Sequence, residues 1–244
     1  MISFLKNHPF PVEAFFERSL VLTFALKKEQ HSGLIPRKLT LDTFQDEWAF
    51  LAVAMVQTHS LRPKGFPQIL GNDFFLIGYR VFVWYQNLAG KNLRGLFILK
   101  SETNKMKMQY LGNLFTHYNY TTTDIKITDD FQLETIKSNR SNFKVSISKE
   151  KEDIALPESS PFDSWKEARR FAGPLPFTFT CNHQTKSVLI IEGIRNNWKP
   201  EPVQVLDYSF DFLNKEFSSA KLASAFEVRN IPYYWKKGKL ETWK

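Results

Sequence analysis

The chain has 244 residues, of which 43% are hydrophobic and 23 are phenylalanine, and its formal net charge is +8. This apolar content excludes a disordered chain and is sufficient for a large buried core. All-β proteins of this length often form one domain, so we expect residues 1–244 to be a single domain. The chain has one cysteine, Cys181, which cannot form an intrachain disulfide and favours a reducing compartment.

The positive charges are spread along the chain, a pattern more typical of a soluble protein than of a nucleic-acid-binding one. The longest apolar run, residues 49–56, is far shorter than the ~20 residues of a membrane-spanning helix. Residues 1–11 lack a basic region followed by an apolar run, so no signal peptide is expected. We therefore expect a cytoplasmic protein without a membrane or nucleic-acid partner.

The first half of the chain has mostly β-strand patterns. The apolar run at residues 49–56 is typical of a strand buried on both faces. Residues 74–85 are dense in aromatic and β-branched side chains, which favour strands. The predicted elements are a helical turn at residues 12–18, strands at 20–26, 49–56 and 74–85, a hairpin turn at 87–92 and a return strand at 95–99.

A helix is predicted next, with Ser101 as its N-cap and Glu102 in its first turn. Met106, Tyr110 and Leu114 are four residues apart, so they would form one apolar stripe, with Leu111 beside them. Gly112 would interrupt this helix near its end.

The second half alternates polar and apolar residues in three places, which predicts half-exposed strands at residues 125–127, 143–147 and 177–181. Asp163 can cap a short helix through Ala172, residues 188–194 form a strand, and residues 210–226 can contain a last helix. Strands with short turns and few helices predict a mainly β fold with a closed or nearly closed antiparallel sheet. Composition does not choose between a barrel and a sandwich.

No motif for a metal or a cofactor is present, so none is expected. The histidines are scattered and form no metal-binding spacing: His8, His31, His59, His117 and His183. The chain also lacks a glycine-rich phosphate loop and a nucleophile elbow. Cys181 alternates with Phe177 and Phe179, which is typical of a core thiol.

Several segments occur in an order that resembles a known family. They are residues 34–36 before residues 39–41, residues 49–55, Tyr79-Arg80-Val81-Phe82-Val83, residues 95–99 and His117-Tyr118. Over residues 12–235 the chain resembles the bacterial YqjF-like family of unknown function, within the acetoacetate decarboxylase-like superfamily. The resemblance implies an antiparallel barrel or double-layered sheet, with short flanking helices and an interior cavity.

The superfamily's decarboxylases use a lysine, activated by a neighbouring lysine, to form a Schiff base with a keto acid. Here the matching pair reads Tyr120-Thr121, two glutamate positions fall on Leu51 and Leu76, and the arginine position falls on Glu17 or Arg18. Lys126 is five residues beyond the matching pair. The resemblance therefore argues against Schiff-base decarboxylation, and the two leucines suggest an apolar cavity wall.

The candidate ligand-binding residues are Arg18, Arg80, His117, Tyr118 and Tyr120. The leading hypothesis is a barrel that binds a small, largely apolar molecule in its cavity. One alternative is an enzyme on small carbonyl or carboxylic substrates, with acid–base chemistry by His117 and a tyrosine. A second is a basic module for nucleic acid or another anionic partner. The sequence leaves the oligomeric state and any catalytic residue open.

Overall fold

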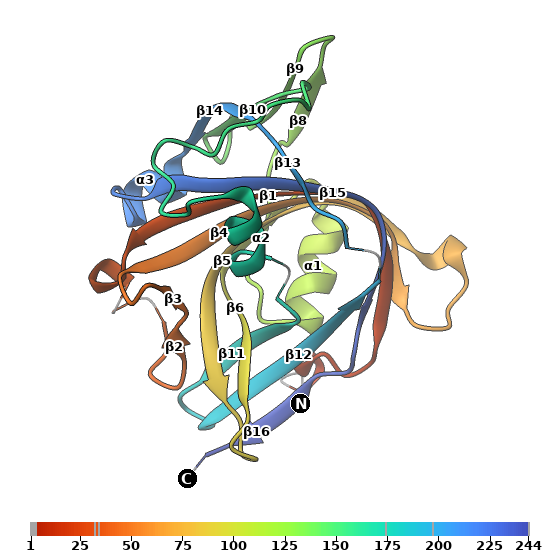
Figure 1. The fold of residues 1–244 in the computed structure, drawn as a ribbon. Helices are drawn as coiled ribbons and strands as arrows, with labels where there is room; N and C mark the ends of the chain where they lie inside the picture. Colours follow the sequence, from red (N-terminus) through yellow and green to blue (C-terminus); the bar gives the residue numbers. More distant parts are fainter. Residues whose placement is uncertain (1–3, 32, 34, 174, 197, 244) are drawn as a thin grey trace.

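The long strands form a closed sheet around the interior of the protein (Figure 1). Their order is β15-β1-β4-β5-β6-β11-β12, and β12 pairs again with β15, which closes the sheet. Most neighbours are antiparallel, but β11 and β6 are parallel, so the sheet is mixed. The expected mainly β barrel is confirmed. The strands are β1 (Val12–Lys27), β4 (Trp48–Pro63), β5 (Asn72–Gln86), β6 (Asn92–Thr103), β11 (Phe177–Asn182), β12 (Ser187–Arg195) and β15 (Lys221–Trp235).

The computed structural model describes residues 4–31, 33, 35–173, 175–196 and 198–243. Leu34, in the first family-like segment, and residues 1–3 lie outside the described residues. The 12-stranded sheet also contains five short strands. These are β2 (Thr40–Leu41), β3 (Thr43–Phe44), β7 (Tyr120–Thr122), β13 (Glu201–Pro202) and β16 (Lys239–Thr242).

A 4-stranded sheet covers one side of the barrel from outside (Figure 1). Leu22, Leu51 and Met55 of the barrel pack against Ile136 and Val145 of this sheet. Each such side chain contributes about 1.5–3 kcal/mol when it is fully buried. The two sheets therefore enclose a dry core, which agrees with the expected double layer. The small sheet contains β8 (Lys126–Asp129), β9 (Leu133–Ser138), β10 (Phe143–Ser148) and β14 (Val205–Phe210).

The two faces of β4 carry side chains of different size. Leu51 and Met55 face the dry core, whereas Ala52 and Ala54 face the barrel interior. Residues 49–56 are buried throughout, as expected of a strand covered on both faces. Because the inward side chains are small, space remains inside the barrel.

In Figure 1, α1 (Met106–Phe115) is seen behind the opening of the barrel, α2 (Trp165–Phe171) in front of it, and α3 (Asp211–Glu216) beside the small sheet. Ala168 of α2 packs with Phe50 and Phe82 of the barrel. The described short 3-10 turns are η1 (Leu5–Asn7), η2 (Lys28–His31) and η3 (Gln68–Leu70). No helix within the described residues is long and apolar enough to cross a membrane.

Three helix predictions need correction. Residues 12–18 belong to β1, because pairing with β4 and β15 on its two sides overrides the local helical pattern. Ser101 and Glu102 end β6, and the helix starts at Met106. Ser164, rather than Asp163, caps α2 by accepting a hydrogen bond from the Glu167 backbone N–H at 3.2 Å. The chain after α3 returns to strand at Lys221.

The expected apolar stripe of α1 is also wrong. Met106 and Tyr110 are 62% and 68% exposed, and the buried side carries Met108 and Gly112. A Cβ on Gly112 would lie 2.3 Å from Cδ2 of Tyr120, so the glycine allows the Tyr120 ring to pack directly on the helix. Glycine gives no hydrophobic signal, which explains why the sequence pattern selected the wrong face.

A β-bulge in β1 places Arg18 on the outer face of the barrel. Phe16 is paired with Thr58 and Arg18 with Gln57, so the residue between them has no partner across β4. Arg18 forms ion pairs with Glu134 of the small sheet and with Glu227 of β15. The guanidinium therefore joins the two sheets.

We predict that Arg18→Ala lowers the free energy of unfolding by about 3–5 kcal/mol, because it leaves the largely buried carboxylate of Glu134 without an ion-pair partner among the described residues, whereas Glu227 keeps its ion pair with Arg229. Urea denaturation measures this change. Lys144→Ala is the matched control, since Lys144 forms an exposed ion pair with Asp207, and its loss should cost about 1 kcal/mol or less. Equal effects of the two substitutions would contradict the structural role of Arg18.

Candidate functional site

A cavity of about 130 Å³ lies inside the barrel, on the other side of β1, β4 and β5 from the dry core. Its wall is mostly apolar. The side chains that line it include Phe16 and Val21 of β1, Ala52, Ala54 and Val56 of β4, Leu76 and Phe82 of β5, Leu96 and Ile98 of β6, and Phe226, Val228 and Trp235 of β15. An apolar cavity of roughly 150 Å³ holds a molecule the size of benzene.

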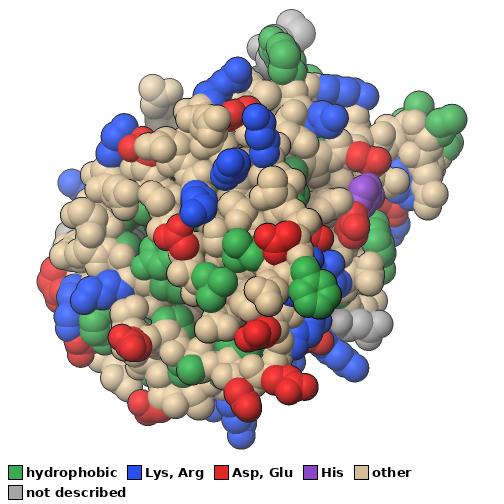
Figure 2. Space-filling model, turned by 90° about the horizontal axis from the view of Figure 1, so that it is seen from above, with side chains coloured by type: hydrophobic (Ala, Val, Ile, Leu, Met, Phe, Trp, Pro, Cys, Tyr) green, Lys and Arg blue, Asp and Glu red, His purple; other side chains and the backbone are tan. Residues whose placement is uncertain are grey.

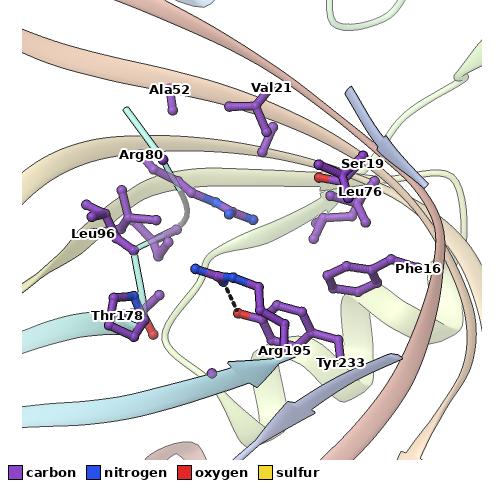
Figure 3. Close-up of a pocket in the computed structure, with 18 of the residues that line it drawn as sticks. Phe16, Ser19, Val21, Ala52, Leu76, Arg80, Leu96, Thr178, Arg195 and Tyr233 are labelled. Carbon is purple, nitrogen blue, oxygen red and sulfur yellow. Dashed lines mark hydrogen bonds between the residues drawn. The ribbon is translucent and has the colours of Figure 1, made fainter. Parts of the chain in front are cut away.

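Two arginines point into this cavity, Arg80 from β5 and Arg195 from the end of β12 (Figure 3). Among the described residues, neither has an ion-pair partner, and Nε of Arg80 is buried without a hydrogen bond. Buried charges in proteins are normally paired. Two unpaired guanidinium groups in one apolar cavity therefore suggest a site for an anion.

The sequence around Arg80 explains its direction. Alternation along β5 sends Leu76, Arg80 and Phe82 inward and Tyr79 into the dry core. A Cβ on Gly78 would lie 2.8 Å from Nε of Arg80. The glycine therefore gives the guanidinium room to lie close to its own strand.

Aromatic side chains hold Arg195. Its Nη1 donates a hydrogen bond to the Tyr233 hydroxyl at 3.1 Å, and its guanidinium lies 4.8 Å from the ring centre of Trp198. Burial lowers the pKa of Arg195, and the charge of Arg80 lowers it further. Arginine remains protonated in proteins, so both groups still carry positive charge.

Tyr118 and Tyr120 also line the cavity. The Tyr118 hydroxyl lies 2.7 Å from Oγ1 of Thr178. Burial raises the pKa of Tyr118 to about 12 and also raises the pKa of Tyr120. Both phenols are therefore protonated at neutral pH and can donate a hydrogen bond to a ligand.

The structure brings together three of the candidate residues, namely Arg80, Tyr118 and Tyr120. Arg18 does not line the cavity, because the bulge in β1 turns it toward Glu134. His117 does not line it either. The chain bends at residues 117–118, and Asn119 has a φ of +52°, so Tyr118 and Tyr120 line the cavity while the His117 ring lies 3.4 Å from Oδ1 of Asn7.

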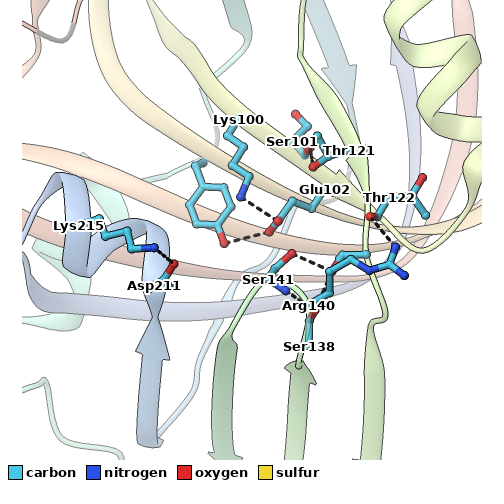
Figure 4. A network of polar contacts seen from close by, with 12 residues as sticks. Lys100, Ser101, Glu102, Thr121, Thr122, Ser138, Arg140, Ser141, Asp211 and Lys215 are labelled. Atoms are coloured by element: carbon cyan, nitrogen blue, oxygen red, sulfur yellow. Dashed lines mark hydrogen bonds and ion pairs between the residues drawn. The ribbon is translucent and has the colours of Figure 1, made fainter.

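Tyr120 and Thr121, which the sequence resemblance matches to the superfamily's lysine pair, start β7, where Tyr120 pairs with Ser101 of β6. Figure 4 shows Thr121 beside Ser101. The described residues that line the cavity include no lysine. The nearby Lys100 forms a 2.9 Å ion pair with buried Glu102 (Figure 4). Lys126 is exposed in the small sheet. Leu76 belongs to the cavity wall, but the expectation for Leu51 is wrong, because alternation places it in the dry core.

Sequence reasoning missed Arg195, Trp198 and Tyr233. A weak signal was present, since Arg195 ends the apolar strand two residues after Gly193, and both therefore face the same side. The pairing of β12 with β15 that brings Tyr233 beside Arg195 is long-range and had no local pattern.

A second cavity of about 150 Å³ adjoins the first. It lies between the barrel wall and α1, and it is lined by Phe74, Met108 and Leu111 together with His8 and Thr58. His8 and Thr58 are 6% and 1% exposed, and Nε2 of His8 and Oγ1 of Thr58 have no hydrogen-bond partner. Each such unpaired buried group costs about 1–3 kcal/mol.

The described residues give no support for a metal centre or for a thiol nucleophile. Among the described residues, no group of three or more His, Cys, Asp or Glu side chains is placed to hold a metal ion. Burial raises the pKa of the Cys181 thiol to about 11, so little of the thiolate nucleophile is present at neutral pH.

The buried His8 predicts a pH-dependent stability. Burial lowers the pKa of His8 from 6.5 to about 4. The unfolded chain therefore binds a proton that the folded chain does not bind, and stability falls as the pH drops from about 6.5 to about 4. Relative to His8→Asn, which tolerates the positive φ of this position, the wild type should lose about 3 kcal/mol across that window in urea denaturation. Parallel pH curves for the two proteins would contradict the burial of a neutral imidazole.

Several solved enzyme structures have a similar fold. An acetoacetate decarboxylase from Legionella pneumophila aligns with a TM-score of 0.64 at 9% identity and covers 96% of this chain and 88% of its own. An acetoacetate decarboxylase-like enzyme from Sphingomonas wittichii gives 0.61 at 10% identity, with 98% and 95% covered. The enduracididine biosynthesis enzyme MppR gives 0.58 at 9% identity, with 95% and 89% covered. These likenesses show the fold.

No relative among curated proteins matches the chain. A family model does match, over residues 14–228, which is most of the chain and includes Arg80, Tyr118 and Arg195. The chain therefore belongs to the DUF2071 family, described as an uncharacterized conserved protein (COG2071), and it has the acetoacetate decarboxylase-like fold.

Proposed function

We propose that the protein binds a small carboxylic acid, as its anion, with an apolar body in the cavity around Arg80 and Arg195. The observation that carries this proposal is the pair of guanidinium groups without a carboxylate partner among the described residues. The apolar wall suits the body of the ligand, and the arginines suit its charge.

The other unpaired polar atoms of the cavity support an anionic ligand. Nε of Arg80 and Nε1 of Trp198 are buried without a partner, and both are hydrogen-bond donors. A carboxylate accepts hydrogen bonds and carries the opposite charge, so it matches both features. MppR, a relative in fold, forms a complex with pyruvate, which is also a carboxylate.

The proposal includes no Schiff base. It is supported by the sequence resemblance, which matches Tyr120 and Thr121 to the superfamily's lysines, and by a described lining without lysine. The protonated phenols of Tyr118 and Tyr120 can orient the bound acid by hydrogen bonds.

The alternatives have less support. Acid–base chemistry by His117 and a tyrosine requires the two groups to meet, but His117 lies outside the cavity lining. On the face seen in Figure 2, basic and acidic side chains are intermixed, whereas a nucleic-acid site needs a contiguous basic surface.

We further propose that residues 1–244 form one domain, because the small sheet and the barrel share a dry core. The single cysteine supports a reducing, cytoplasmic location.

Replacement of either cavity arginine tests the anion site. Arg80→Met and Arg195→Met should each weaken binding of isovalerate or benzoate by about 2 kcal/mol or more, which is roughly thirtyfold. Isothermal titration calorimetry measures the dissociation constants, with isovaleramide and benzamide as neutral analogues. Both variants should unfold at equal or higher urea concentration, because methionine removes an unpaired charge from an apolar cavity.

The matched control is Arg170→Met on α2, since Arg170 is exposed and does not line the cavity. It should leave carboxylate binding unchanged. Equal affinity of the wild type for the acids and their amides would overturn the proposed function.

Reductive trapping tests the absence of a Schiff base. Incubation with pyruvate or acetoacetate and sodium borohydride should leave the mass of the protein unchanged in mass spectrometry, because no described lining residue offers an amine nucleophile. A stable adduct on a lysine, located by peptide mapping, would restore the decarboxylase-type mechanism.

A further inference from the structure

The second cavity is a neighbour of the arginine cavity. The two share a wall formed by Phe16, Leu76, Tyr118, Tyr120 and Trp235. Its own lining is more apolar and comes largely from α1 and the β5 residue Phe74. At about 150 Å³ it has room for one group the size of an aromatic ring.

His8 and Thr58 are the two described lining residues whose polar atoms are buried without a partner. The polar groups of Arg62 and Thr116 in the lining have partners. Arg62 pairs with Glu13 at 2.8 Å and donates to two backbone carbonyls, and the Thr116 hydroxyl donates to the Gly112 carbonyl. Native proteins leave few buried polar atoms unpaired. Two such atoms in one cavity therefore suggest that a ligand atom forms hydrogen bonds with them.

The backbone holds His8 in an unusual conformation. Its φ is +51°, in the left-handed region that non-glycine residues rarely adopt. Its N–H donates to the Phe115 carbonyl at the end of α1, and its carbonyl accepts from the Gly238 N–H. These contacts fix the imidazole in the cavity at the cost of backbone strain, which often accumulates at functional sites.

The chemistry of the pair selects the ligand. The imidazole of His8 is uncharged at neutral pH, and it has either a donor or an acceptor at Nε2. A ligand hydroxyl both donates and accepts, so it satisfies His8 in either tautomer, together with the Thr58 hydroxyl. A carboxylate would be desolvated here without a free cation, because Arg62 is already engaged.

We propose that the second cavity binds an apolar group that carries one neutral hydroxyl, held by His8 and Thr58. Such a group is either a separate neutral molecule or the far end of the acid bound at Arg80 and Arg195. The site itself does not depend on the proposed function of the arginine cavity.

Calorimetry with phenol, and with toluene as its apolar analogue, tests the site. Thr58→Val should weaken phenol binding by about tenfold, because one hydrogen bond is lost, and should leave toluene binding unchanged or improved. His8→Asn should change the phenol-to-toluene preference in the same direction. Thr58→Val should also resist urea better than the wild type, since it removes an unpaired hydroxyl.

Thr23→Val is the matched control. The Thr23 hydroxyl is equally buried and unpaired, but it lines neither cavity. This variant should gain stability and keep the wild-type affinity for phenol. If phenol does not bind, or binds equally to the wild type, Thr58→Val and His8→Asn, the proposed site is wrong.

A second arm identifies the source of the hydroxyl. A series of ω-hydroxy carboxylic acids is titrated against the matching unsubstituted acids, in the wild type and in Arg195→Met. If the ω-hydroxyl increases the affinity of the acid, and Thr58→Val removes this increase, one extended acid occupies both cavities. If the ω-hydroxyl does not increase the affinity of the acids, and Arg195→Met still binds phenol as the wild type does, the ligand is a separate neutral molecule. Failure of the arginine site appears only in the acids, so the two proposals fail independently.

Discussion

The alternation of inward and outward side chains along β1, β4 and β5 is the constraint on which the rest of the structure depends. These strands are shared by two compartments, since their outer face packs on the small sheet and their inner face lines the cavity. Large residues such as Leu51 and Met55 fill the outer side, and Ala52 and Ala54 leave space on the inner side. A shift of one residue in register would exchange the two sets. The bulge beside Arg18 shows such a shift within one strand, and it converts a potential cavity residue into the link between the sheets.

The pairing of charged side chains also differs between the cavity and the rest of the protein. Largely buried charges outside the cavity have partners, as in the pairs Arg18 with Glu134 and Lys100 with Glu102. Arg80 and Arg195 have none among the described residues, and burial, together with the charge of Arg80, lowers the pKa of Arg195. Replacing one of them with an apolar residue would remove this repulsion and one unpaired charge from the cavity. The retention of both in one apolar cavity is therefore better explained by a ligand than by stability.

Local patterns of the sequence were sufficient for several strands but not for the site. The strand at residues 74–85 and the apolar run at 49–56 follow from side-chain type alone. The phenols Tyr118 and Tyr120 and Arg80 were identified by resemblance and position. Arg195 and Tyr233 meet because β12 pairs with β15, and Arg18 leaves the cavity because of a bulge; both depend on register between distant strands. His117 was misplaced because the chain bends at residues 117–118 and the imidazole lies beside Asn7 instead of in the cavity.

An unpaired buried polar atom does not by itself indicate a site in this protein. The hydroxyls of Thr23 and Ser224 are buried without partners in places that line neither cavity, so some unpaired atoms have only a structural cost. Arg80 and Trp198 differ, because they share one cavity and both offer donors. His8 and Thr58 share the other cavity and include an uncharged imidazole. The unpaired polar atoms therefore differ between the two sides of the shared wall. The first cavity has hydrogen-bond donors, one of them on a charged guanidinium, and the second has neutral groups. A single ligand that spans the wall would need an acidic end and a neutral polar end, and two ligands would divide these features between them.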